Sequence, residues 1–376
     1  MAKPHLALKI AAAVLAAGVA VWTVRHFSEP SYQGKLLSVW LDEAARRGDT
    51  RWLDIMESRG RDSQPAQAIL AIGRRGLPLL LSLLRAKETP LRKKLRDFAQ
   101  THKWIPINRR EPNELHALAL YGFWVLGPAA KSAVPELIAA LEDDDAQVRA
   151  VAAYALSLVG PADIAALPAL EKRLMALSQT PPSPGDWQAE LRCVLHAVGE
   201  MGPPAWSALP QITQLSQQSS QVTVLATAAR IKITGKGLDS AIEPLKNPSA
   251  IADWRAAYQV AFELGTNAAP AVPLLVTNLQ YTNMEVQFDA LAALIRIHAR
   301  PDLCGPAIAQ FLSSSDDFTL LEVLVVLSAF GPAATQWVST SQITPCLTNH
   351  HEWIRVEATN ALRRLYPEAA AKLNVK

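Results

Sequence analysis

Residues 126–137 read LGPAAKSAVPEL, and this stretch decides how the chain is organised. Gly127 ends one apolar helical segment, and Pro135 begins the next one eight residues later. A glycine just past a helix end takes left-handed backbone dihedrals without a side-chain clash, and a proline in a first helical turn gives up a hydrogen bond that is missing there anyway. The stretch therefore predicts a helix, a tight turn and a second helix.

The glycine-to-proline spacing returns along the chain at a nearly fixed period. Further copies run from Gly160 to Pro168, from Gly202 to Pro210 and from Gly265 to Pro273. Gly127 and Gly160 are 33 residues apart, and Gly265 and Gly331 are 66 apart, so a unit without its glycine is expected at residues 282–313. A period of this length is typical of stacked structural repeats.

Helical periodicity dominates the chain, because apolar residues recur three and four positions apart and strand signals are weak. In residues 145–160 the apolar stripe consists of Val148, Val151, Ala152, Ala155, Leu156 and Val159. Two insertions interrupt the period, at residues 85–113 and 178–186, and the prolines of the second predict a surface loop. These patterns predict an all-α chain of stacked helix pairs.

The repeated unit resembles a HEAT repeat, including the type known as the phycobilin-lyase HEAT-like repeat. The resemblance covers residues 64–366 and includes an acidic residue followed by a Val-Arg step at Asp145-Ala146-Gln147-Val148-Arg149, with a weaker copy at residues 351–355. In residues 283–287 glutamine stands in place of the arginine, which argues against a continuous ladder of charges. The resemblance implies a right-handed α-solenoid of about seven or eight stacked antiparallel helix pairs, preceded by an N-terminal apolar helix.

The N-terminal residues predict an export signal. Lys3 and Lys9 precede a run of fifteen uncharged residues, 10–24, which Arg25 follows. As a helix this run spans about 22 Å, short of a hydrocarbon core of about 30 Å, so residues 1–27 are either a cleaved signal peptide or a membrane anchor. With residues 32–35 and 38–41, this leader resembles exported bacterial HEAT-repeat proteins. We expect the body outside the cytoplasm, with capping helices at 28–63, the solenoid at 64–366 and a tail at 367–376.

The charge pattern argues against nucleic acid as a partner. Residues 28–110 carry 17 basic and 9 acidic groups, whereas residues 111–376 carry 17 and 25, so the body as a whole is neutral. A nucleic-acid binder would carry a large basic surplus. Cys193, Cys304 and Cys346 are too few and too scattered for a disulfide framework, and packing as small apolar side chains is the better interpretation.

No motif for catalysis, a cofactor or a metal stands out. A nucleophile elbow and a complete phosphate-binding loop are both absent from the sequence. His350-His351-Glu352 is the densest histidine cluster, but it lies at a predicted helix start, where adjacent side chains point in different directions, and we expect a solvated cap. Cys193 and His196 are interpreted as core residues, and the acidic run at 142–145 as a helix cap. We therefore expect no small-molecule substrate.

The basic insertion is the segment most enriched in candidate contacts. Thr89-Pro90 predicts the start of an amphipathic helix, and an extended stretch around Trp104 follows. This segment either packs on the first repeats, lies on anionic headgroups or contacts an acidic partner. The candidates for partner or membrane contact are Arg92, Lys93, Lys94, Arg96, Lys103, Trp104, Arg109, Arg110 and, in the second insertion, Trp187. Trp40, Trp124, Trp206, Trp254 and Trp353 are predicted to be core residues.

The sequence favours a non-catalytic scaffold that binds a protein or peptide on a long curved surface, as repeat proteins commonly do. A membrane-surface tether that uses residues 85–110 is the first alternative. A lyase-type enzyme, suggested only by the resemblance, is the second.

Overall fold

The structure is a computed structural model that describes residues 29–46, 63–101, 110–160, 164–179, 185–217, 219–247, 251–297 and 301–373. The predicted leader, residues 1–27, lies outside these residues, as do Lys103, Trp104 and Arg109. A short antiparallel hairpin opens the described chain, with β1 (Ser31–Tyr32) paired to β2 (Lys35–Leu36), Ser31 opposite Leu36. Its turn needs positive φ at both central residues, Gln33 and Gly34.

Helix α2 (Leu37–Arg46) follows the hairpin and caps the first helix pair. Trp40 is buried beneath the hairpin, donates from Nε1 to the Tyr32 carbonyl at 3.2 Å and has the Lys35 ammonium 4.3 Å from its ring centroid. The hairpin and α2 thus cover the apolar end of the stack, which an open repeat array would otherwise expose to water.

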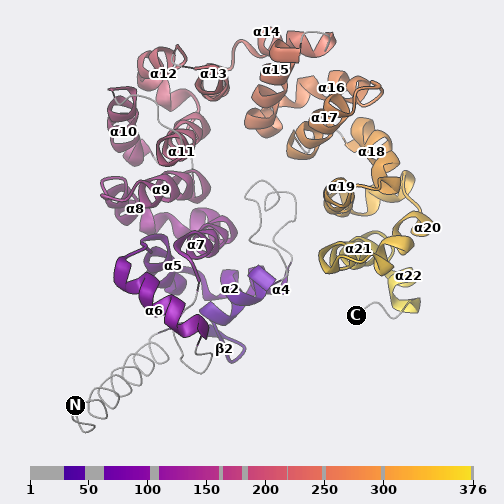
Figure 1. The fold of residues 1–376 in the computed structure, drawn as a ribbon, viewed down its shortest axis with the longest axis horizontal. Helices are drawn as coiled ribbons and strands as arrows, with labels where there is room; N and C mark the ends of the chain where they lie inside the picture. The colour runs from indigo at the N-terminus through magenta and orange to yellow at the C-terminus, as the bar shows by residue number, and fades with distance from the viewer. Residues whose placement is uncertain are drawn as a thin grey trace.

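Nine helix pairs follow within the described residues, and they form two rows (Figure 1). The inner row comprises α4 (Gln64–Ile72), α7 (Pro112–Leu126), α9 (Ala146–Val159), α11 (Asp186–Glu200), α13 (Ser220–Thr234), α15 (Ile251–Leu264), α17 (Met284–Ile297), α19 (Asp317–Phe330) and α21 (Glu352–Leu365). The outer row comprises α5 (Leu77–Leu84), α8 (Val134–Ala140), α10 (Leu167–Gln179), α12 (Leu209–Leu215), α14 (Leu238–Ile242), α16 (Val272–Asn278), α18 (Pro301–Ala309), α20 (Thr340–Ile343) and α22 (Pro367–Lys372). Short 3₁₀ turns, η1 to η9, join or extend them.

The fold confirms the all-α solenoid, has nine helix pairs among the described residues where about seven or eight were expected, and adds two details. The unit expected at residues 282–313 without its glycine is the pair α17 and α18. The expected C-terminal tail is partly wrong, because Pro367–Lys372 forms α22 and packs back on α21 through the buried Ala370. Proline at its first position begins this last helix, as it does in the repeats.

The glycine turns work as the sequence predicts. Gly127, Gly202, Gly265 and Gly331 have φ of 49°, 64°, 54° and 62°. At each, the chain leaves an inner helix and passes through a 3₁₀ turn. Because these dihedrals strain any residue that carries a Cβ, the glycines fix where each inner helix ends.

The fourth residue of several inner helices closes the turn that precedes it. Arg149 Nη1 donates to the carbonyls of residues 143 and 144 at 2.8 and 3.1 Å, and Arg355 Nη1 donates to those of residues 349 and 350 at 2.8 and 3.0 Å. Gln287, where the arginine is replaced, donates from Nε2 to the carbonyls of residues 279 and 281 at 3.3 and 2.6 Å. The turn is therefore kept without the charge.

Arg149 also reaches the next repeat. Its guanidinium donates from Nε and Nη2 to the two oxygens of Glu190 at 2.9 and 2.7 Å. Arg173 donates from Nε to the same carboxylate at 2.8 Å. Glu190 is 1% exposed, so one buried carboxylate joins two guanidinium groups between the pairs α9/α10 and α11/α12.

The stack is curved, and the inner row lines its concave side while the outer row forms its convex side (Figure 1). Its buried apolar residues form two main clusters that meet at α13. Val222, Ala226 and Ala229 of α13 face the N-terminal cluster, whereas Val224 and Ala228 face the C-terminal one. Helix α13 therefore packs against both clusters and connects the N-terminal and C-terminal halves of the curved stack.

Four described stretches are long and apolar enough to cross a membrane by length and composition: Gln64–Leu84, Pro112–Ala140, Asp253–Asn278 and Asp317–Gln336. Each contains a glycine with positive φ just after its inner helix, at Gly73, Gly127, Gly265 or Gly331, so each consists of two segments that meet at a bend. The most deeply packed of these stretches has 72% of its apolar window buried in the protein. Packing against neighbouring helices accounts for the apolar composition of that stretch.

Candidate functional site

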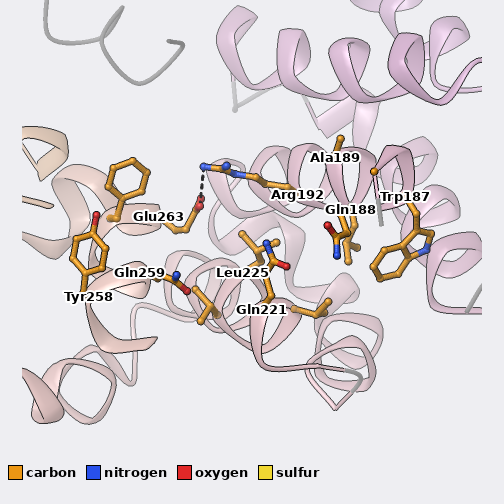
Figure 2. A pocket seen from close by; sticks show the side chains of 14 residues that line it. Trp187, Gln188, Ala189, Arg192, Gln221, Leu225, Tyr258, Gln259 and Glu263 are labelled. Atoms are coloured by element: carbon orange, nitrogen blue, oxygen red, sulfur yellow. Dashed lines mark ion pairs between the residues drawn. The ribbon is translucent and has the colours of Figure 1, made fainter. Parts of the chain in front are cut away.

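A groove of about 490 Å³ lies across helices α11, α13 and α15 (Figure 2). Its lining side chains come in pairs four residues apart, which puts both members on one face of their helix. The pairs are Gln188 with Arg192 on α11, Gln221 with Leu225 on α13, and Tyr258 with Phe262 and Gln259 with Glu263 on α15. Three successive inner helices therefore share one lining.

An ion pair closes one side of the groove. Arg192 Nη2 lies 3.0 Å from Glu263 Oε1, so the pair joins α11 to α15 across the intervening α13 (Figure 2). Helices two apart in the row can meet in this way only on the concave side, where curvature brings them together. Leu225 and Ala228 of α13 line a small hollow together with Arg192 and Glu263.

Three glutamines give the groove its polar character. Gln188, Gln221 and Gln259 are exposed, and their amides have no hydrogen-bond partner among the described residues. A primary amide offers both donors and an acceptor, which matches the backbone of an extended chain. Packed helices are about 8–10 Å apart, and an extended chain rises about 3.3 Å per residue, so one helix corresponds to about three residues of a bound segment.

A second hollow of about 440 Å³ continues the groove toward the C-terminus. It lies between α15 and α17 and shares Tyr258 and Gln259 with the first. Met284, 80% exposed, and Phe288 form its apolar wall. The centroid of the Phe288 ring lies 6.2 Å from that of Phe318 on α19, so exposed aromatic surface extends over two successive inner helices, next to the half-buried Tyr258 and Phe262 of α15.

The charged residues that line the two hollows are three acids and two bases. Arg192 pairs with Glu263, and Arg255 pairs with Glu285 at 2.9 Å. Asp289 is the third acid of the lining, one more than the number of bases there. Burial raises the pKa of its carboxyl above the usual range, Arg255 opposes this shift, and Glu285 reinforces it. The groove thus carries one surplus acid that is poorly solvated and would gain from a cationic neighbour.

The candidate residues of the basic insertion differ in burial: some are buried or ion-paired, and others are exposed to solvent. Helix α6 (Pro90–Thr101) begins where predicted, and the Arg92 backbone N–H donates to Thr89 Oγ1 at 3.1 Å. Arg96 is buried and ion-paired with Glu88. Lys93 and Lys94 are exposed, so partner or membrane contact stays a prediction for them.

Arg110 and Trp187 are the remaining candidate residues that the structure describes, and the first is ion-paired while the second is buried. Arg110 Nη2 lies 3.0 Å from Asp42 Oδ1, which ties the insertion back to α2. Trp187 is 7% exposed and belongs to the N-terminal core cluster while forming the end wall of the groove. The burial of Arg96 and Trp187 removes them as free surface anchors.

Four of the five tryptophans predicted for the core are buried or partly buried, and one is exposed. Trp40, Trp124 and Trp254 are buried, and Trp353 packs partly buried against the C-terminal clusters. The prediction is wrong for Trp206, which is 62% exposed in η4 (Pro203–Ala208). Its position follows the apolar period, but the 3₁₀ turn rotates it away from the core.

Cys193 and His196 pack as predicted. Burial raises the pKa of the Cys193 thiol to about 12 and lowers the pKa of His196 well below its usual range. The His196 ring stacks on Tyr154, with centroids 5.1 Å apart. A protonated thiol and a neutral imidazole in these surroundings are inert packing groups.

The acidic run caps α9 as expected. Asp145 Oδ1 accepts from the backbone N–H groups of Gln147 and Val148 at 2.8 and 3.3 Å. The expectation for His350 and His351 is wrong in one respect: the adjacent side chains converge, and both reach Asp317 of the preceding repeat.

Trp187 is the one residue of the groove among the candidates predicted from the sequence, and the glutamines and the other aromatic residues are not among them. Gln188 and Gln221 are 33 residues apart, one full period, and this is the signal that could have found them. Gln259 follows after 38 residues, which breaks the period.

No protein-family model matches the chain, and no curated protein matches it. Among solved structures it is similar to the complex of CpcE and CpcF of phycocyanin lyase from Nostoc sp., with 19% identity and a TM-score of 0.39 over 80% of this chain and 97% of that one. It is also similar to human deoxyhypusine hydroxylase in complex with glycerol, with 17% identity and a TM-score of 0.31 over 74% of this chain and 100% of that one. An engineered protein has 18% identity and a TM-score of 0.32 over 87% of this chain and 98% of its own. Nothing about activity or ligands follows from likenesses at this level.

Proposed function

We propose that this chain is a non-catalytic scaffold that binds an extended segment of a partner protein along its concave groove. The observation that carries the proposal is the set of exposed amides, Gln188, Gln221 and Gln259, beside exposed aromatic rings on successive inner helices. Amides satisfy the polar backbone of a bound chain, and aromatic side chains supply contact area at a low cost in conformational entropy.

The lining also favours one class of segment. Tyr258, Phe262 and Phe288 offer room for apolar side chains, and the surplus acid Asp289 attracts a lysine or arginine. We therefore propose a partner segment that alternates apolar residues with at least one basic residue. Electrostatic complementarity of this kind contributes mainly to specificity and to the association rate.

We further propose that this scaffold acts outside the cytoplasm, because the uncharged run at residues 10–24 with Lys3 and Lys9 before it has the pattern of an export signal. Cell fractionation should place the body outside the inner membrane. The mass of the mature N-terminus then separates an anchor from a cleaved signal, and a cytoplasmic full-length chain would contradict export.

Site-specific photo-crosslinking in the native cell tests the binding proposal. A photoreactive amino acid at Gln259 should crosslink to a protein partner, whereas the same group at Gln214, an exposed glutamine of the outer helix α12, should not. Equal crosslinking at the two positions, or none at Gln259, would contradict binding in the groove. Sequencing the crosslinked peptide then shows whether a basic residue lies near Asp289.

A further inference from the structure

Three potential metal ligands converge at the contact between the last two inner helices. Asp317 lies in the first turn of α19, and His350 and His351 immediately precede α21, its neighbour in the row (Figure 1). Asp317 Oδ2 is 3.3 Å from His350 Nε2 and 3.4 Å from His351 Nε2. All three ligand atoms lie within 4.8 Å of one another.

The two distances from Asp317 Oδ2 to the histidine nitrogens fit edges of a tetrahedral site. Zinc binds imidazole nitrogen and carboxylate oxygen at about 2.0–2.2 Å, which sets the ligands of a tetrahedron about 3.3–3.6 Å apart. A charge-assisted hydrogen bond between one imidazolium and the carboxylate would instead be about 2.7–2.9 Å long. We propose that Asp317, His350 and His351 bind a divalent transition metal ion of the zinc class.

The surroundings hold these ligands in place. Asn349 Nδ2 donates to the second oxygen of Asp317 at 3.1 Å, which leaves Oδ2 facing the histidines. The His351 ring stacks on Trp353 with centroids 4.7 Å apart. Arg355 donates to the carbonyls of residues 349 and 350 and so fixes the backbone that carries both histidines. Such outer contacts orient the ligands of metal sites.

The donor set also selects the ion. Two imidazoles with one carboxylate favour zinc, copper, nickel or iron over magnesium and calcium, which prefer oxygen ligands. Three protein ligands leave at least one coordination position open. The His350 and His351 side chains are 72% and 43% exposed, so water or a donor group from a bound molecule can reach that position.

Zinc titration calorimetry on the full chain, after removal of metal with a chelator, tests the proposal. The wild type should bind one zinc ion that excess magnesium does not displace. Asp317→Asn and His350→Gln should each weaken binding about tenfold or more, the scale at which even outer contacts act. The control is Asp239→Asn, an exposed aspartate in the first turn of α14, and it should leave the affinity unchanged.

A second measurement decides the matter if either variant fails to fold. Anomalous diffraction at the zinc edge from wild-type crystals should place a peak between Asp317, His350 and His351. Undiminished affinity in the two variants, the absence of zinc binding by the wild type, or an anomalous peak elsewhere would overturn the assignment.

Discussion

Replacing Glu190 with glutamine removes the charge that holds two arginines between neighbouring helix pairs. Glu190 is 1% exposed, and it accepts hydrogen bonds from Arg149 and Arg173, whose side chains are 17% and 18% exposed. Removing one partner of a buried ion pair costs about 3–5 kcal/mol, because the remaining charge is left uncompensated. Both guanidinium groups keep some access to water, so Glu190→Gln should lie near the lower end, at about 3 kcal/mol.

Urea denaturation followed by circular dichroism measures this loss, and hydrogen exchange of α9 and α11 localises it, because repeat proteins open locally. Glu136→Gln on α8, an exposed carboxylate, is the matched control and should change stability by less than about 1 kcal/mol. A loss below about 1 kcal/mol for Glu190→Gln would refute the reasoning. Adding Arg173→Met to Glu190→Gln should recover part of the loss, because one of the two stranded charges is then removed while the bonds of Arg149 to the preceding turn are kept.

Three further predictions concern the stack. Gly331→Ala should destabilise by about 1–2 kcal/mol in urea denaturation, because φ is 62° although a Cβ would meet no atom within 4 Å. His116 Nε2 is hydrogen-bonded to the Ala86 carbonyl at 2.9 Å, and burial lowers the pKa of its imidazole. As pH falls below about 6.5, His116 is protonated in the unfolded chain before it is protonated in the folded one, so the folded state loses stability. The melting temperature of His116→Gln should therefore fall less between pH 7 and pH 5 than that of the wild type. Asp316 caps α19, and hydrogen bonds from the Thr319 side chain and backbone lower the pKa of its carboxyl. The ionised cap therefore stabilises the fold above the ordinary aspartate pKa, and this stabilisation is lost as pH falls through the lowered pKa. Asp316→Ala should cost about 1 kcal/mol at pH 7, and a cost that is undiminished in acid would contradict this account.

Local sequence predicts most of this fold because each repeat contacts mainly its neighbours. The dihedral requirement at Gly127 and the proline at Pro135 act within one turn, so the pattern carries the structure directly. The pair α17/α18 follows from the period even without its glycine. The last helix is harder to predict, because a single proline, Pro367, marks its start and no later copy of the unit follows.

The candidate site depends on the arrangement of several helices, so less of it can be predicted. Gln188, Gln221 and Gln259 each have the character of ordinary solvated residues on their own helix, and only the curvature of the row brings them to one groove. The burial of Arg96 depends on Glu88 turning back toward α6. The convergence of His350 and His351 likewise requires Asp317 from the preceding repeat.

The affinity of the crosslinked segment, made as a synthetic peptide, tests the binding groove most directly. Phe288→Ala removes an exposed ring from the groove, and Trp206→Ala removes an even more exposed ring outside it. The account predicts a loss of about tenfold or more in affinity for Phe288→Ala, the scale of an aromatic anchor, and less than about twofold for Trp206→Ala. An unchanged affinity in Phe288→Ala, or a larger loss in Trp206→Ala, would contradict the concave groove as the binding surface.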